Sequence, residues 1–189
     1  MLYEGTYTDT PYGPVNVVQS DISLEALCAY DRVIVSGYFN PTQEEFKVLK
    51  QYVQQGGHLL INAGQAKSYW RDSEFWGGSV SSATTAVSSA AMNGTSYTFS
   101  AGIHGYSGTA AALITTPSGP LAVENSVGKG SVVLTLTDQY DLAASQRPEL
   151  LPYYGDLLRY MIGKGGAYET DAVYAKGLQY LHLKKEGKP

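Results

Sequence analysis

The sequence predicts an α/β fold, with helices on the faces of a central sheet, and three observations support this. Two short apolar segments rich in β-branched residues, 32–36 and 59–61, are typical of strands buried on both faces. Residues 42–55, between them, have the pattern of an amphipathic helix. Because parallel strands joined by one helix need a right-handed crossover, this strand–helix–strand unit favours a sheet covered by helices.

The helix of this unit has a start signal, an apolar face and a stop signal. Asn40 or Thr42 can cap its N-terminus, and Glu44 and Glu45 follow, where the helix dipole favours carboxylates. Gly56 suits its end. Its apolar stripe consists of Phe46, Leu49, Tyr52 and Val53.

Shorter elements are expected in the rest of the chain. Residues 1–14 predict an irregular lead-in, and 79–125 an added β-hairpin region. Further strands are expected at 15–18, 85–92, 96–100, 111–115, 121–125, 131–137 and 178–183, and further helices at 24–29 and 148–162. Asn93-Gly94 indicates a tight hairpin turn, an interpretation preferred over the glycosylation sequon that Asn93-Gly94-Thr95 also fits. We expect strand 131–137 to return to the central sheet.

Composition bounds the class of protein. With 189 residues and 43% hydrophobic content, the chain can bury one core, which favours a single domain. A net charge of -4 argues against a nucleic-acid partner, and no apolar segment approaches the roughly 20 residues that span a membrane. Sixteen tyrosines with only 16% charged residues slightly favour an extracellular or periplasmic location.

Neither a metal nor a cofactor is expected. The single cysteine, Cys28, excludes an internal disulfide and a cysteine metal cluster, and its apolar surroundings predict a core residue rather than a nucleophile. His58, His104 and His182 lie far apart in the sequence and lack the i, i+4 spacing of a helical zinc site.

The chain resembles a known family over about residues 15–163. The segments DRVIVSGYFNPTQEEFKVLKQYVQQGGHLLINAG, SEFWGG and GPLAVENSVGKGSVVLTLTDQYDL, with the terminal amphipathic helix, resemble class I glutamine amidotransferase-like domains. The version appended to carbohydrate-active enzymes, such as the trimerisation domain of family-42 β-galactosidases, is the most similar. The resemblance implies a flavodoxin-like three-layer sandwich with a mostly parallel central sheet over 1–163. Residues 164–189 resemble a linker or the start of a β-sandwich, so we expect a segment of a longer polypeptide.

The resemblance also implies that the family's chemistry is lost. A working amidotransferase places a cysteine on the turn after the strand that matches 59–61, and a histidine and a carboxylate after the strand that matches 132–137. The first position holds Asn62, Ala63 and Gly64. The second holds Asp138, Gln139, Tyr140 and Asp141, without a histidine.

The two matched positions would lie at the carboxyl ends of the predicted strands, where a cleft without the family's chemistry is expected, called the vestigial cleft below. The candidate ligand residues surround it. They are Tyr38, Asn62, Gln65, Trp70, Trp76, Asp138 and Tyr140. The aromatic residues of segment 69–76 suit either stacking on sugars or anchoring of the loop to the sheet or a neighbour, and anchoring is preferred. Asp138 and Asp141 suit an acid–base pair, but closing a strand and capping a turn is the preferred interpretation.

The function predicted from the sequence is that of a non-catalytic ancillary or oligomerisation domain of a glycoside hydrolase or polysaccharide lyase. Its partners would be neighbouring domains or identical subunits, with carbohydrate as a further candidate. One alternative is a carbohydrate-binding module whose pocket is lined by Tyr38, Trp70, Trp76 and Tyr140. Another is a small hydrolase that uses Asp138 or a serine which the sequence does not mark.

Overall fold

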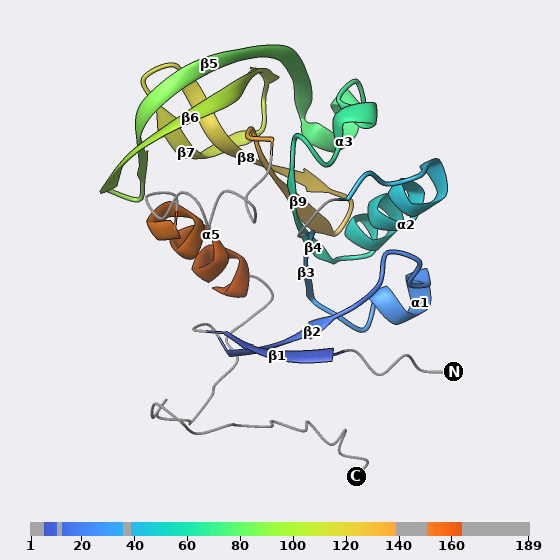
Figure 1. The fold of residues 1–189 in the computed structure, drawn as a ribbon. Helices are drawn as coiled ribbons and strands as arrows, with labels where there is room; N and C mark the ends of the chain where they lie inside the picture. Colours follow the sequence, from blue (N-terminus) through green and yellow to red (C-terminus); the bar gives the residue numbers. More distant parts are fainter. Residues whose placement is uncertain (1–5, 11–12, 36–38, 139–150, 164–189) are drawn as a thin grey trace.

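The computed structural model describes residues 6–10, 13–35, 39–138 and 151–163. Its main sheet has seven strands in the order β3-β4-β9-β8-β7-β5-β6, and a separate two-stranded sheet pairs β1 with β2 (Figure 1). The strands are β1 (Thr6–Thr10), β2 (Gly13–Val17), β3 (Arg32–Ile34), β4 (His58–Asn62), β5 (Gly78–Met92), β6 (Thr95–Gly108), β7 (Ala111–Thr116), β8 (Gly119–Val127) and β9 (Gly130–Thr135). The helices are α1 (Leu24–Leu27), α2 (Gln43–Gln54), the 3-10 helix η1 (Lys67–Tyr69), α3 (Ser73–Trp76) and α5 (Leu151–Gly163).

The predicted strand–helix–strand unit is confirmed. β3 and β4 are parallel, with Val33 opposite Leu59, and α2 connects them. β9 lies on the other side of β4 and is also parallel to it, with Leu60 opposite Val133. The prediction that segment 131–137 returns to the central sheet is therefore confirmed.

The start of α2 follows the pattern expected from the sequence. Thr42 is the N-cap, and its hydroxyl accepts a hydrogen bond from the backbone N–H of Glu45, at 3.3 Å. The Glu45 carboxylate accepts one in return from the Thr42 backbone N–H, at 2.8 Å, which completes a capping box. The bond from the Thr42 backbone N–H is the main cause that lowers the pKa of Glu45. All four residues of the predicted apolar stripe are buried.

Helices cover both faces of the sheet because the side chains of its central strands alternate. On β4, Leu59 and Ile61 pack in one hydrophobic cluster with the buried residues of α2, whereas Leu60 packs in a second cluster with Tyr153 and Leu157 of α5. The two clusters form the core, one on each face of the sheet. The mixed α/β class that the sequence predicts is thus confirmed.

The expectation of a mostly parallel sheet was wrong. The four pairs among β9, β8, β7, β5 and β6 are antiparallel, so the sheet is mixed. The region 79–125 is continuous with the central sheet. Its strands are antiparallel because short hairpin connections can join only antiparallel neighbours. The Asn93-Gly94 turn is confirmed: both residues have a positive φ, of 49° and 83°, as such a turn requires.

Three further expectations need correction. β3 is only partly buried because, among the described residues, it lies at the edge of the sheet. The predicted lead-in contains β1, which pairs with β2. Cys28 is exposed rather than part of the core, and its Sγ donates to Oε1 of Gln55 at 3.4 Å.

Some predictions fall outside the described residues. The strand at 178–183 and the start of the helix at 148–162 do so, and the domain boundary at 163 stays a prediction although α5 ends there. Within the described ranges, no helix is long and apolar enough to cross a membrane. No group of three or more potential metal ligands gathers in that same part of the chain.

Candidate functional site

The candidate site lies where the parallel strands β4 and β9 end side by side. Their register pairs Asn62 with Thr135, so the segments that follow the two strands meet at the same edge of the sheet. Open α/β sheets usually hold their ligands at this edge. The structure thereby brings together three predicted candidates, Asn62, Gln65 and Asp138.

Asn62 and Gln65 belong to a buried hydrogen-bond network. The Thr135 hydroxyl donates to Oδ1 of Asn62 at 2.5 Å. Oε1 of Gln65 accepts from the backbone N–H of Asn62 at 3.0 Å and from its side-chain Nδ2 at 3.1 Å. Asn62 is only 4% exposed and Gln65 3%. Because these polar groups satisfy one another, their main contribution is to fix the turn rather than to contact a ligand.

The turn after β4 is closed by the chain that leaves β9. The backbone N–H of Gly64 donates to the Thr137 carbonyl at 3.3 Å. A Cβ atom on Gly64 would lie 2.0 Å from the backbone oxygen of Asp138, so only glycine fits there. Ala63 is fully buried. The turn that the sequence resemblance compared with a nucleophile position is therefore tightly packed.

His104 is a site residue that the sequence reasoning missed. Its ring is buried, and Nε2 lies 2.7 Å from Oδ1 of Asp138, whose carboxylate is exposed. Nδ1 lies 3.2 Å from the backbone oxygen of Ser81, so each ring nitrogen faces an oxygen acceptor. The backbone N–H of His104 also donates to the Leu136 carbonyl at 2.7 Å, which ties β6 to the end of β9. No local signal predicted this contact, because His104 lies inside a strand far from Asp138 in the sequence.

The two tryptophans anchor the loop that follows β4. Trp70, 8% exposed, donates its Nε1–H to the Ala63 carbonyl at 2.7 Å, and its ring centroid lies 4.6 Å from that of His104. Trp76 has no exposed surface and donates its Nε1–H to the Tyr69 carbonyl at 2.8 Å. A ring without exposed surface has no face to offer to a sugar, so Trp76 is corrected from a ligand candidate to a core residue. The remaining candidates, Tyr38 and Tyr140, lie outside the described residues.

The chemistry available at this edge is limited. His104 and Asp138 form an imidazole–carboxylate pair of the kind that serves a nucleophile in hydrolases. In the described part of the chain, however, no hydroxyl or thiol is hydrogen-bonded to His104. Among the described residues, the pair joins β6 to the segment that follows β9, and no third member of a catalytic triad accompanies it.

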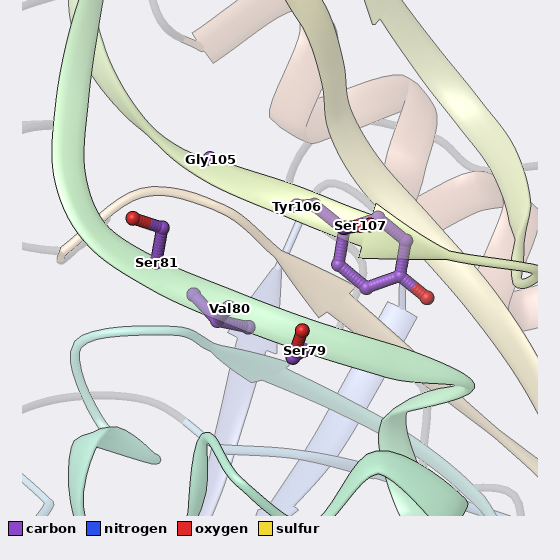
Figure 2. Close-up of a pocket in the computed structure, with 6 residues that line it drawn as sticks. All are labelled: Ser79, Val80, Ser81, Gly105, Tyr106 and Ser107. Atoms are coloured by element: carbon purple, nitrogen blue, oxygen red, sulfur yellow. The ribbon is translucent and has the colours of Figure 1, made fainter.

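A shallow hollow of about 290 Å³ lies on the neighbouring ribbon of β5 and β6 (Figure 2). Figure 2 shows that one strand supplies Ser79, Val80 and Ser81 and the other supplies Gly105, Tyr106 and Ser107. The Tyr106 hydroxyl is engaged, because it donates to the Trp76 carbonyl at 3.0 Å, and burial raises its pKa.

A larger hollow of about 510 Å³ follows one side of α2 and is called the α2 groove below. α2 lines it with Gln43, Glu44, Phe46, Lys47, Lys50, Gln51 and Gln54, and the segment after β4 adds Tyr69 and Asp72. Nζ of Lys50 and Oδ2 of Asp72, both among its lining residues, lie 2.6 Å apart. Of the predicted ligand residues that the structure describes, none lines this groove.

No protein-family model and no curated protein sequence matches the chain. Solved structures do resemble it. An exo-β-1,4-mannosidase from Opitutaceae bacterium strain TAV5 matches 79% of this chain with 22% identity and a TM-score of 0.55. A GH42 β-galactosidase from G. stearothermophilus matches 78% with 17% identity and a TM-score of 0.55. A cytoplasmic protein of Salmonella typhimurium matches 72% with 17% identity and a TM-score of 0.56.

The extent of these matches differs between the neighbours. The matched region is 27% of the mannosidase and 23% of the β-galactosidase, but 72% of the Salmonella protein. The chain thus spans about a quarter of the two glycosidases. At these identities the likeness establishes a shared fold: this chain has the fold of one part of glycosidases that include a GH42 β-galactosidase.

Proposed function

We propose that this chain is a non-catalytic accessory domain of a larger carbohydrate-active enzyme, either a glycoside hydrolase or a polysaccharide lyase. In this proposal it is a glutamine amidotransferase-like, flavodoxin-like domain that has lost its glutaminase triad. Its partners are neighbouring domains of the parent enzyme or identical subunits, and its role is to hold them together.

The closed turn after β4 carries the proposal. The family's nucleophile position is occupied by Asn62, Ala63 and Gly64, and Gly64 packs directly against the backbone of Asp138. A nucleophile needs an oxyanion site and room for a substrate carbonyl beside it. A turn without that space supports a structural rather than a catalytic role.

The shared fold supports the choice of parent. The mannosidase and the β-galactosidase each contain this fold as about a quarter of their length, which leaves most of each enzyme outside it. Two helix-covered sheet faces give a rigid unit suited to packing against another domain. The buried state of Trp70 and Trp76 argues against the alternative of a carbohydrate-binding pocket at the vestigial cleft.

Turnover assays on the 189-residue chain test the proposal. We expect no hydrolysis of glutamine, of generic esters or of aryl glycosides, both in the wild type and in the Asn62→Ala and Asp138→Ala variants. Hydrolysis that either substitution abolishes would overturn it. Sequencing of the complete open reading frame then tests whether the chain belongs to a larger enzyme. The proposal requires a catalytic domain in the same reading frame or in a stably bound partner.

A further inference from the structure

We propose that the α2 groove is a binding site for a neutral oligosaccharide. The inference rests on the proposed association with a carbohydrate-active enzyme, but it places the sugar away from the vestigial cleft. The groove's volume of about 510 Å³ is within the range of small-molecule sites.

The charges that line the groove cancel. Lys50 pairs with Asp72, with Nζ and Oδ2 at 2.6 Å, and Lys47 lies 4.0 Å from the Glu44 carboxylate. Two ammonium groups and two carboxylates leave no net charge to attract a phosphate, a nucleic acid or an acidic peptide. A ligand without charge is therefore the best electrostatic match.

Three primary amides remain for hydrogen bonding. Gln43, Gln51 and Gln54 recur at intervals of eight and three residues, so they lie on one side of α2. Among the described residues, their side chains have no hydrogen-bond partner. Each amide offers both a donor and an acceptor, and a sugar hydroxyl is likewise both. A row of such groups matches a chain of hydroxyls better than it matches an apolar ligand.

The groove also contains a fixed aromatic surface. The rings of Phe46 and Tyr69 stack with centroids 3.9 Å apart and planes 7° from parallel. The Tyr69 hydroxyl donates to the Pro41 carbonyl at 2.9 Å, which holds the ring in place. Because Tyr69 is half-buried, part of its ring remains available to the C–H face of a pyranose. The Trp76 ring, by contrast, is fully buried and offers no such surface.

The test is calorimetric titration of the 189-residue chain with neutral β-1,4-linked manno- and galacto-oligosaccharides. The double variant Gln51→Ala/Gln54→Ala removes two amides from the groove, and alanine suits a helix, so the fold should be retained. Gln55→Ala is the matched control, because that amide is adjacent in sequence but outside the groove. We expect binding to weaken about tenfold or more in the double variant and to stay unchanged in the control.

Three outcomes would overturn the inference. The first is the absence of binding by any neutral oligosaccharide up to about 10 mM, and the second is binding that the double variant leaves unchanged. The third is a groove that a neighbouring domain covers in the full-length parent. None of these results touches the turnover assays, so failure of the sugar site and failure of the accessory-domain proposal can be told apart.

Discussion

Nε2 of His104 lies 2.7 Å from Oδ1 of Asp138, although the two residues are 34 positions apart in the sequence. The contact joins β6, at one edge of the sheet, to the segment that leaves β9 near its centre. Together with the backbone bond from His104 to Leu136, it holds the long β5–β6 hairpin over the candidate site, where Figure 1 shows β5 arching across the molecule.

Substitution of the two members of this pair should have unequal effects on stability. His104→Ala removes a buried ring that packs on Trp70, so we expect it to lower the free energy of unfolding by about 2 to 4 kcal/mol. Asp138→Asn changes an exposed carboxylate and should cost less than about 1 kcal/mol. Urea denaturation measures both values, and equal losses would contradict the view that packing of the ring dominates.

Gly64→Ala should destabilise the fold because the new Cβ would lie 2.0 Å from the backbone oxygen of Asp138. Two backbone segments must then separate, which we expect to cost about 2 kcal/mol or more. Gly163→Ala is the control: among the described residues, nothing lies within 4 Å of its Cβ position, so its effect should be within about 0.5 kcal/mol of zero. Thermal unfolding of the two variants makes the comparison.

A thiol at position 63 should be unreactive in the folded chain. Ala63 is fully buried, so in a Cys28→Ala background the Ala63→Cys thiol can be modified only when the turn opens. We expect its reaction with a colorimetric disulfide reagent to be at least about a hundredfold slower than that of the exposed Cys28 in the wild type. Similar rates, with the circular dichroism spectrum unchanged, would show an open turn and remove the main support for a non-catalytic domain.

The stability contributed by Asp156 should depend on pH. The Tyr97 hydroxyl donates to its Oδ2 at 2.5 Å and, with Arg159, holds the pKa of Asp156 below its usual value. A carboxylate whose pKa is lower in the folded state stabilises the fold above its unfolded pKa of about 4, and this stabilisation is lost as the pH falls through the folded pKa. Tyr97→Phe should therefore lower the free energy of unfolding by about 0.5 to 1 kcal/mol at pH 7, and by less at about pH 2.

The control for this prediction is Tyr69→Phe. The Tyr69 hydroxyl donates to a backbone carbonyl, that of Pro41, which does not titrate. Its loss should lower stability by the same amount at both pH values. A pH-independent effect of Tyr97→Phe, measured by urea denaturation in the same buffers, would contradict the assigned coupling to Asp156.

Local sequence patterns determined the elements that depend on neighbouring residues. Thr42 and Glu45 form a capping box three residues apart, and the apolar stripe of α2 follows helical spacing, so both could be predicted. The Asn93-Gly94 turn needs only two residues with positive φ.

Only the tertiary structure decided which distant segments meet. The sequence could not reveal that His104 reaches Asp138, that Trp76 is fully buried, or that a hairpin region completes the central sheet. Such contacts depend on how strands pair and stack after the chain has closed long loops, and loop closure leaves no pattern in adjacent residues. The sequence by itself therefore determined the strand–helix–strand unit, whereas packing decided that the turn at Gly64 is closed.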